Sequence, residues 1–162
     1  MRKAKPKPPS AIDLLKEDHA YVKQAYRNFE KMDQEDLPAV QALVSEVCKA
    51  LEAHTKMEED IFYPAVRRAL DEDDLMKEAE IEHDSAKTLI RRLKRMKPSD
   101  AAYVPTFTVL CEYVMHHVKE EEGELFPQMK SSDLDLEELG ARMRARMQEL
   151  MGQVNEEEKL EH

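Results

Sequence analysis

One sequence pattern occurs twice in this chain, at an offset of 63 residues, and it constrains the fold more than any other feature. Each copy has a His, a Lys two positions later, two Glu at the fourth and fifth positions, and a Pro at the tenth. The copies occupy residues 54–64 and 117–127. Because residues i and i+4 lie one turn apart on the same face of an α-helix, each copy places a His beside a Glu.

A second repeat, at an offset of 64, precedes each copy of the first. Residues 17–23 align with residues 81–87 through an acid, a His and, four positions after the His, a Lys. This alignment pairs His19 with His83. The two repeats together predict two helical hairpins related by duplication. Each hairpin would contribute one His from its first helix and a His-x3-Glu from its second.

The rest of the chain also favours helices. It has only three Gly among 162 residues, and good helix formers such as Ala, Leu, Glu, Lys and Met are abundant. Ser10 with Asp13 matches a capping box, Asp36 is a candidate N-cap before Pro38, and Pro64 is expected to kink or split its helix. We predict helices over residues 11–32, 38–70, 74–96, 101–130 and 136–156.

Short turns between long helices make neighbouring helices antiparallel. The predicted fold is therefore all-α, an antiparallel up-down-up-down four-helix bundle with an additional C-terminal helix. A hydrophobic content of 41% is sufficient for one core, and the length fits one domain. We assign residues 1–10 to a disordered, basic, Pro-rich arm, residues 11–159 to the helical bundle and residues 160–162 to a tag remnant.

The repeats predict a metal site in the interior of the bundle. Two packed hairpins bring together two imidazoles for each of two metals, and carboxylates can bridge metals about 3.5–4 Å apart. This donor set suits iron, whereas zinc and manganese stay open because spacing alone does not select a metal. The candidate ligands are His19, His54, Glu58, His83, His117 and Glu121.

Several other classes of function are excluded or disfavoured. Scattered glycines cannot form a Rossmann or P-loop phosphate site, and a net charge of −10 disfavours nucleic acid as a partner. No apolar run is long enough to span a membrane, and no signal peptide is visible. Two Cys form no disulfide framework, which favours a cytoplasmic location.

Other familiar classes of metal or redox site do not fit the sequence either. A ferritin-type di-iron site needs two Glu-x-x-His motifs, but only Glu80-x-x-His83 occurs. Neither the His-Glu-x-x-His motif of zincin hydrolases nor a Cys-x-x-Cys motif occurs, which disfavours zincins, zinc ribbons and simple thioredoxin chemistry.

The repeats resemble those of hemerythrin-like proteins, the His-His-Glu cation-binding family. The resemblance spans residues 11–130 and rests on Asp18-His19, on Glu82-His83 and on the two His-x3-Glu copies, which run into Phe-Tyr-Pro and Phe-Pro. It implies an antiparallel four-helix bundle around a non-haem di-iron centre with a solvent-derived oxo or hydroxo bridge. The resemblance implies that His19 and His54 bind one iron and that His83 and His117 bind the other. Glu58 and Glu121 would bridge the two irons.

The sequence departs from the oxygen-carrying hemerythrins of invertebrates at one ligand. Those proteins have a further His one turn away on the third helix, where this chain has Ala79 and Lys87 on either side of His83. The set of four His and two Glu is more similar to bacterial hemerythrin-like domains, including the di-iron domain of iron–sulfur cluster repair proteins. Those repair proteins also carry a small Cys-containing N-terminal domain, which this sequence does not show.

Some neighbours of the ligands are further candidates. Glu80, one turn before His83, is either an additional ligand or an exposed acid. Tyr113, one turn before His117, either hydrogen-bonds a bound ligand or a ligating His, or packs in the core. The two Cys are expected to be small buried hydrophobes, with a redox pair as the alternative. The side chains expected to point away from the ligand face are Glu59, Glu122, His116, Cys48 and Cys111.

These observations favour a non-haem di-iron protein that binds or senses a small ligand such as oxygen, nitric oxide or peroxide. One alternative is an iron storage or delivery protein, including an iron donor of the iron–sulfur repair type. Another is an interaction module with a structural metal such as zinc. The residues do not decide between binding and catalysis.

Overall fold

The computed structural model describes residues 7–161, without the side chains of residues 158 and 161, and this part of the chain contains helices and no strand. The prediction of an all-α chain is confirmed. Two π-helical turns, η1 (Glu58–Phe62) and η2 (Glu121–Leu125), each lie between two α-helices. The α-helices are α1 (Ala11–Lys31), α2 (Leu37–Met57), α3 (Tyr63–Ala69), α4 (Asp73–Arg95), α5 (Tyr103–Glu120), α6 (Phe126–Lys130) and α7 (Leu136–Glu161).

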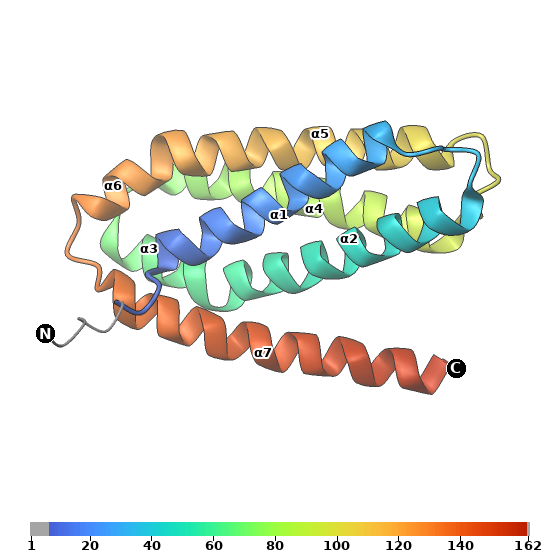
Figure 1. The fold of residues 1–162 in the computed structure, drawn as a ribbon. Helices are drawn as coiled ribbons and strands as arrows, with labels where there is room; N and C mark the ends of the chain where they lie inside the picture. Colours follow the sequence, from blue (N-terminus) through green and yellow to red (C-terminus); the bar gives the residue numbers. More distant parts are fainter. Residues whose placement is uncertain (1–6, 162) are drawn as a thin grey trace, which may run out of the picture.

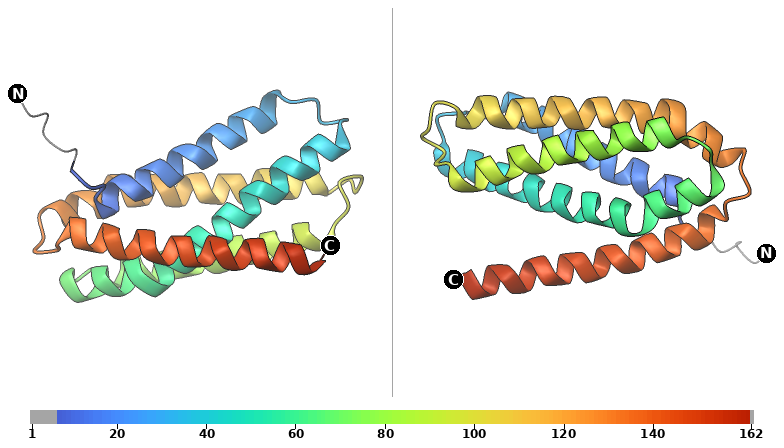
Figure 2. Two further views of the ribbon diagram at one scale, coloured as in Figure 1. Left: turned by 60° about the horizontal axis from the view of Figure 1, so that its bottom comes forward. Right: turned by 180° about the vertical axis from the view of Figure 1, so that it is seen from behind.

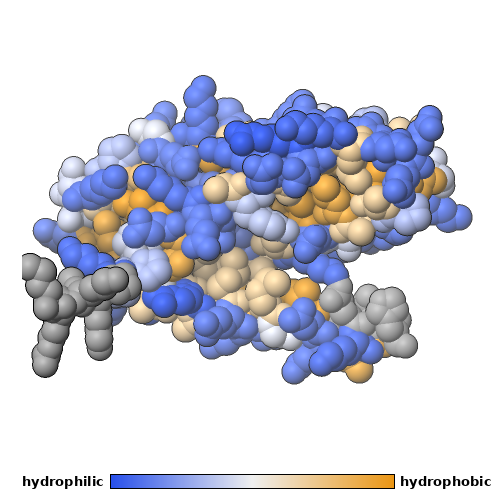
Figure 3. All heavy atoms as spheres, in the orientation of Figure 1, coloured by the Kyte–Doolittle hydropathy of each residue, from blue (hydrophilic) through white to orange (hydrophobic). Residues whose placement is uncertain are grey.

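The helices α1, α2, α4 and α5 lie side by side, and successive ones run in opposite directions (Figures 1 and 2). α1 pairs with α2 and α4 pairs with α5, and α1 contacts α5 while α2 contacts α4. α7 runs along the outside and packs against α1, α2 and η1, and hydrophobic residues gather between it and the helices above it (Figure 3). No helix of the described residues is long and apolar enough to cross a membrane.

The predicted helix starts are confirmed at two caps. The Ser10 hydroxyl accepts from the Asp13 backbone at 3.2 Å, and the Asp13 carboxylate accepts from the Ser10 backbone at 3.0 Å. The Asp36 carboxylate accepts from the Ala39 backbone at 3.3 Å, with Pro38 in the first turn of α2. These bonds satisfy backbone N–H groups that a helix start leaves unpaired.

The predicted split at Pro64 takes the form of a π turn. η1 ends directly before the first turn of α3, which contains Pro64, and η2 stands in the same relation to Pro127. Proline has no backbone N–H to continue an α-helical ladder, so a wider turn before it costs less than in an uninterrupted helix. The predicted helices over 38–70 and 101–130 are therefore each an α–π–α segment.

The two ends of the chain differ in part from expectation. Residues 1–6 of the predicted arm and residue 162 of the predicted tag remnant lie outside the described residues. Residues 7–10 precede α1 without regular secondary structure. α7 continues to Glu161, past the predicted end at residue 156, because no Gly or Pro follows Gly152 to stop it.

The core has two apolar clusters, and the predicted His ligands lie between them along the four helices of the two hairpins, α1, α2, α4 and α5. On α1, Leu15 belongs to one cluster and Val22 to the other, with His19 between them. On α2, Leu51 and Met57 stand on either side of His54 in the same way. The polar residues thus form a single layer enclosed by apolar packing, where water is excluded and electrostatic interactions are strong.

Candidate metal centre

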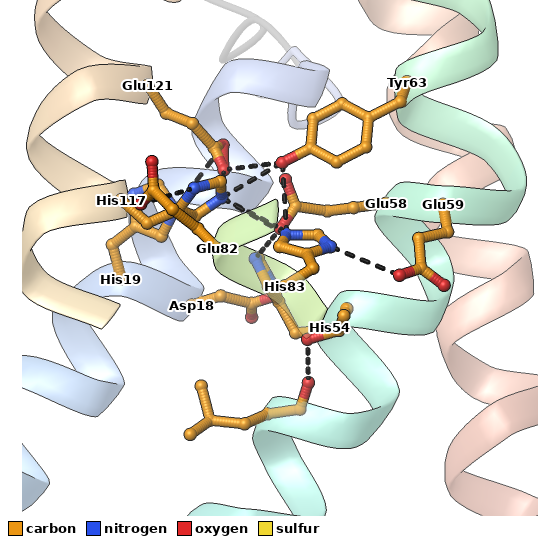
Figure 4. Close-up of polar contacts among 12 residues, drawn as sticks. Asp18, His19, His54, Glu58, Glu59, Tyr63, Glu82, His83, His117 and Glu121 are labelled. Atoms are coloured by element: carbon orange, nitrogen blue, oxygen red, sulfur yellow. Dashed lines mark hydrogen bonds and ion pairs between the residues drawn. The ribbon is translucent and has the colours of Figure 1, made fainter. Parts of the chain in front are cut away.

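The structure brings all six predicted ligands into one layer of the interior (Figure 4). Five of them are buried, and His54 is 12% exposed. The donor atoms of these six residues fall into two groups, each within 4.8 Å: His19, His54 and Glu121 form one, and Glu58, His83 and His117 form the other. A third and more exposed group, Glu82, His116 and Glu120, contains none of the predicted ligands.

Each carboxylate lies between the two groups. Glu58 Oε1 is 2.7 Å from His54 Nε2 and 3.5 Å from His83 Nε2. Glu121 Oε1 is 2.5 Å from His117 Nε2, and its Oε2 is 3.9 Å from His19 Nε2. Two carboxylates that each reach both groups can bridge two metal ions, which is the arrangement expected from the repeats.

A second carboxylate faces the outer nitrogen, Nδ1, of every His. Asp18 accepts from His54 Nδ1 at 2.8 Å, and Glu59 lies 3.4 Å from His83 Nδ1. Glu82 lies 3.5 Å from His117 Nδ1, and Glu122 lies 3.6 Å from His19 Nδ1. A hydrogen-bonded acceptor at Nδ1, as at His54 and His83, fixes the tautomer and leaves Nε2 free to bind a metal. Nδ1 of His117 and of His19 faces its carboxylate without forming a hydrogen bond.

These outer carboxylates were foreseen only in part. Glu59 and Glu122 were expected to point away from the ligand face, and they do so by supporting a His of the opposite hairpin. The same role of Asp18 and Glu82 was missed, although an acid precedes the His in both copies of the repeat. The repeated acid directly before the His was the sequence signal from which this role could have been predicted.

Tyr63 is a further site residue that the sequence reasoning did not single out. Its hydroxyl lies 3.2 Å from His83 Nε2 and 3.0 Å from His117 Nε2, and it donates to Glu121 Oε1 at 3.4 Å. Burial, with the charges of Glu121 and Glu58, raises the pKa of Tyr63 well above its usual value. The side chain is therefore a neutral phenol that can donate a hydrogen bond inside the layer.

The donor set fits a metal ion because several buried polar atoms lack a hydrogen bond of good geometry. Among the described residues, both ring nitrogens of His19, both carboxylate oxygens of Glu58 and one oxygen of Glu121 form no hydrogen bond of good geometry. Buried polar atoms without partners are rare and costly in proteins. Cations coordinated by these atoms would satisfy them.

Without a metal, protons on two imidazoles balance the carboxylates. Burial opposes charge on His54, but Glu58 and Asp18 prevail and raise its pKa to about 10. Burial also opposes charge on Glu58, yet the nearby imidazoles hold its pKa well below the ordinary range. Burial and the charge of Glu58 raise the pKa of Glu121 to about 7. Burial and the neighbouring His54 lower the pKa of His19 to about 4.

The structure places the remaining candidates outside the layer. Glu80 is half exposed and pairs with Arg67, so it is an exposed acid and not part of the ligand cluster. Tyr113 is 44% exposed and lines the cavity beside the layer, where it can face a bound ligand. His116 is 64% exposed and lies 3.5 Å from Glu82, facing away from the layer as expected.

Both cysteines are buried free thiols, as expected of small buried residues. Burial, with the charge of Glu52, raises the pKa of Cys48 to about 12. Burial, with the neighbouring Cys48, raises the pKa of Cys111 to about 12. Thiols held this far in the neutral form are unreactive at neutral pH.

Comparison with known proteins agrees with this geometry. Residues 10–129 match the Hemerythrin HHE cation binding domain family. The chain belongs to this family. A crystal structure of an HHE cation binding domain-containing protein, the Rv2633c homologue of Mycobacterium kansasii, superposes with a TM-score of 0.75 at 28% identity. That match covers 89% of this chain and 88% of the other.

A second similar protein is much longer than this chain. It is a DNA nickase of Nostoc sp. (strain PCC 7120), 28% identical over 120 residues, which are 74% of this chain. The chain spans only 33% of the length of that relative. The activity in its name is that of the longer protein and is not assigned to this chain.

An apolar cavity adjoins the inner face of the HHE centre. Its volume is about 250 Å³, and its wall includes His19, His54, Glu58, His83 and His117. The rest of the wall is largely apolar, with Val22, Leu51, Ala86, Val114 and Val118 from the bundle and Met147 and Met151 from α7. α7 lies beyond the segment that matches the family, yet it closes part of this cavity.

Proposed function

We propose that this protein is a hemerythrin-like di-iron protein that binds a small ligand, such as oxygen, nitric oxide or peroxide, in the cavity beside the metal layer. The observation that carries the proposal is the pair of three-residue groups joined by two shared carboxylates. An antiparallel four-helix bundle with α7 as an added helix is the form of the fold that we propose for this family member.

The metal would be held by Nε2 of the four His and by Glu58 and Glu121, and a solvent-derived oxo or hydroxo bridge is part of the proposal. Six protein ligands for two ions leave coordination positions open. Iron, when bound, would supply reversible redox chemistry and an exchangeable position for the ligand.

The residues of the chain have four tasks. The outer carboxylates orient the imidazoles and increase their basicity. Tyr63 offers a hydrogen-bond donor at the group that contains His83 and His117. The apolar wall of the cavity admits a small, weakly polar molecule and offers few polar contacts to a large substrate. Met147 and Met151 of α7 cover part of that wall.

The test is metal analysis followed by ligand titration. The metal-free full chain is loaded anaerobically with ferrous iron, and bound iron is counted per chain. About two irons per chain, with absorption changes on adding oxygen, nitric oxide or peroxide, would support the proposal. Two irons without any spectral response would favour storage or delivery. Failure to bind iron, with one tightly held zinc, would favour a structural metal.

The partner and the location of the protein stay predictions. A small-molecule ligand without nucleic acid or membrane is expected from the acidic charge and the cavity. Cell fractionation would test the cytoplasmic location.

A further inference from the structure

An ion pair connects α7 to the first π turn. Nε and Nη2 of Arg146 donate to Oδ2 of Asp60 at 3.1 Å and 3.0 Å. Asp60 is the third residue of η1, and its other oxygen accepts from Lys56 at 3.0 Å. Both partners are about one quarter exposed, so the pair lies at the edge of the packed interface and is not a freely solvated contact.

The same turn carries site residues on its inner side. η1 begins with Glu58, and Tyr63 follows its last residue. Glu58 and Tyr63 face the metal layer (Figure 4), whereas Asp60 bonds to α7. One turn therefore joins the outer helix to the centre. π turns are rare and need tertiary contacts to persist, because the α-helical ladder competes with them.

The second π turn shows that this support is specific to the first. Gly123 occupies the position of Asp60 in the duplicated turn η2. A Cβ placed on Gly123 would have no heavy atom within 4 Å, so no neighbouring element covers that side of η2. The two halves of the centre are therefore built on differently supported turns.

We propose that Arg146 is a positioning residue of the metal centre, which acts through Asp60 to hold η1, and with it Glu58 and Tyr63, in the geometry that binds metal. This inference rests on the proposed metal site but does not depend on iron or on the small ligand. Its effect is directional: loss of Arg146 loosens the first π turn and leaves the second unchanged.

The first test is cobalt binding by the metal-free full chain, followed through the visible absorption of bound Co²⁺. Arg146→Met keeps most of the apolar side-chain length and removes the ion pair. We expect it to weaken cobalt binding about 10–100-fold, the usual cost of losing a residue that orients ligands, and to change the band shape. Arg144→Met, an exposed position on the same helix, removes the same charge and should bind cobalt as the parent does.

Further variants separate positioning from general destabilisation. Asp60→Ala should weaken binding as Arg146→Met does, and the double variant should be no weaker than the Asp60→Ala variant, because the two residues act on each other. Arg146→Lys should restore part of the affinity. Leu139→Ala, which removes buried apolar contact of α7 without touching the pair, should lower stability but leave the cobalt spectrum unchanged.

The second test is amide hydrogen exchange in the metal-free protein. In Arg146→Met, exchange should increase in residues 58–63 and stay unchanged in residues 121–126. The inference would be overturned if Arg146→Met changed amide exchange equally in the two turns, or if this variant bound cobalt as the parent does. If the parent chain itself binds no cobalt and no iron, the proposed function fails, and exchange in the two turns still reports on the ion pair.

Discussion

Tyr63 and Phe126 occupy matching positions in the two hairpins, yet they give the halves of the centre different chemistry. Each comes five residues after the bridging Glu, directly after a π turn. The Tyr63 hydroxyl meets His83 and His117, whereas the Phe126 ring stacks on His19 with centroids 6.1 Å apart and 4° between the ring planes. The metal ligands of the two halves are equivalent by duplication, and these two side chains make the halves unequal.

Replacing Tyr63 by Phe should make the two halves more alike. The substitution removes the only polar difference between the matched aromatic positions and keeps the ring that packs against Phe62. We expect the variant to bind two irons with at most a few-fold change in affinity, and its two Mössbauer doublets to converge. Two doublets as different as in the parent would show that Tyr63 does not distinguish the halves.

Replacing Glu58 by Gln should reduce metal binding more than replacing Glu59 by Gln. Glu58 lies between the two groups of ligands, so its loss removes a bridging ligand and lowers the bound metal by about one ion per chain. Glu59 supports His83 from outside, so its loss should cost about 10–100-fold in affinity and leave the number of sites at two. Metal titration followed by elemental analysis measures both, and equal stoichiometry in the two variants would contradict this ligand assignment.

At the scale of elements, the helices could be predicted and the π turns could not. Composition, caps and prolines are local signals, and they located every long helix to within a few residues. A π turn depends on the tertiary packing of its neighbours, so an α-helical count of positions misplaces everything after Glu58. Tyr63 was missed for this reason: in an α-helix it would lie off the ligand face, and the wider turn brings it back. For Glu80 the helical position left two possibilities open, and the exposed acid is confirmed, since Glu80 is half exposed and pairs with Arg67.

The docking of α7 on α1 leads to contrasting effects of two glycine substitutions. A Cβ at Gly140 would lie 2.7 Å from the Pro9 carbonyl oxygen and 2.8 Å from the Ala11 nitrogen, so the start of α1 would have to move. Gly152 meets no atom within 4 Å, and its φ is ordinary. We expect Gly140→Ala to destabilise the fold by about 1–3 kcal/mol and Gly152→Ala to stabilise it by about 0.5–1 kcal/mol. Urea unfolding measures both, and equal effects would refute this account of the α7 contact.

At the scale of the whole molecule, the metal layer links parts that are distant in sequence. Glu59 of the first hairpin supports His83 of the second, and Glu122 of the second supports His19 of the first. The six residues of the layer and their hairpins could be predicted from the sequence because the duplication repeats their spacing. The cavity could not be predicted from the sequence, because part of its wall depends on how α7 packs. The stripe of apolar residues on α7 does not specify which face of the bundle α7 covers.

The proton balance of the layer predicts how metal affinity depends on pH. In the metal-free protein the pKa of His54 is about 10, so at neutral pH a metal must displace its proton. The pKa of Glu121 is about 7, so a lower pH also protonates a ligand. Both effects make metal binding more favourable as pH rises. The apparent affinity for the metal ion should increase by up to about tenfold per pH unit for each displaced proton.

Calorimetric titration with zinc at about pH 6 and about pH 8, in buffers of different ionisation enthalpy, would count the released protons. The raised pKa of His54 also stabilises the metal-free fold below pH 6.5, and that contribution is lost as pH rises toward 10. The gain in Tm on adding metal should therefore grow with pH. An affinity that is the same at both pH values would contradict the proton assignment.

The exchange of supporting carboxylates between hairpins has a consequence for biosynthesis. Neither half of the chain contains a complete set of oriented ligands, so a nascent chain that has emerged only through α2 and α3 offers no finished site to a passing ion. The full set of oriented side chains exists only after residue 122 has been synthesised and both hairpins have docked. If the layer binds two ions as proposed, we expect complete loading to follow folding rather than precede it.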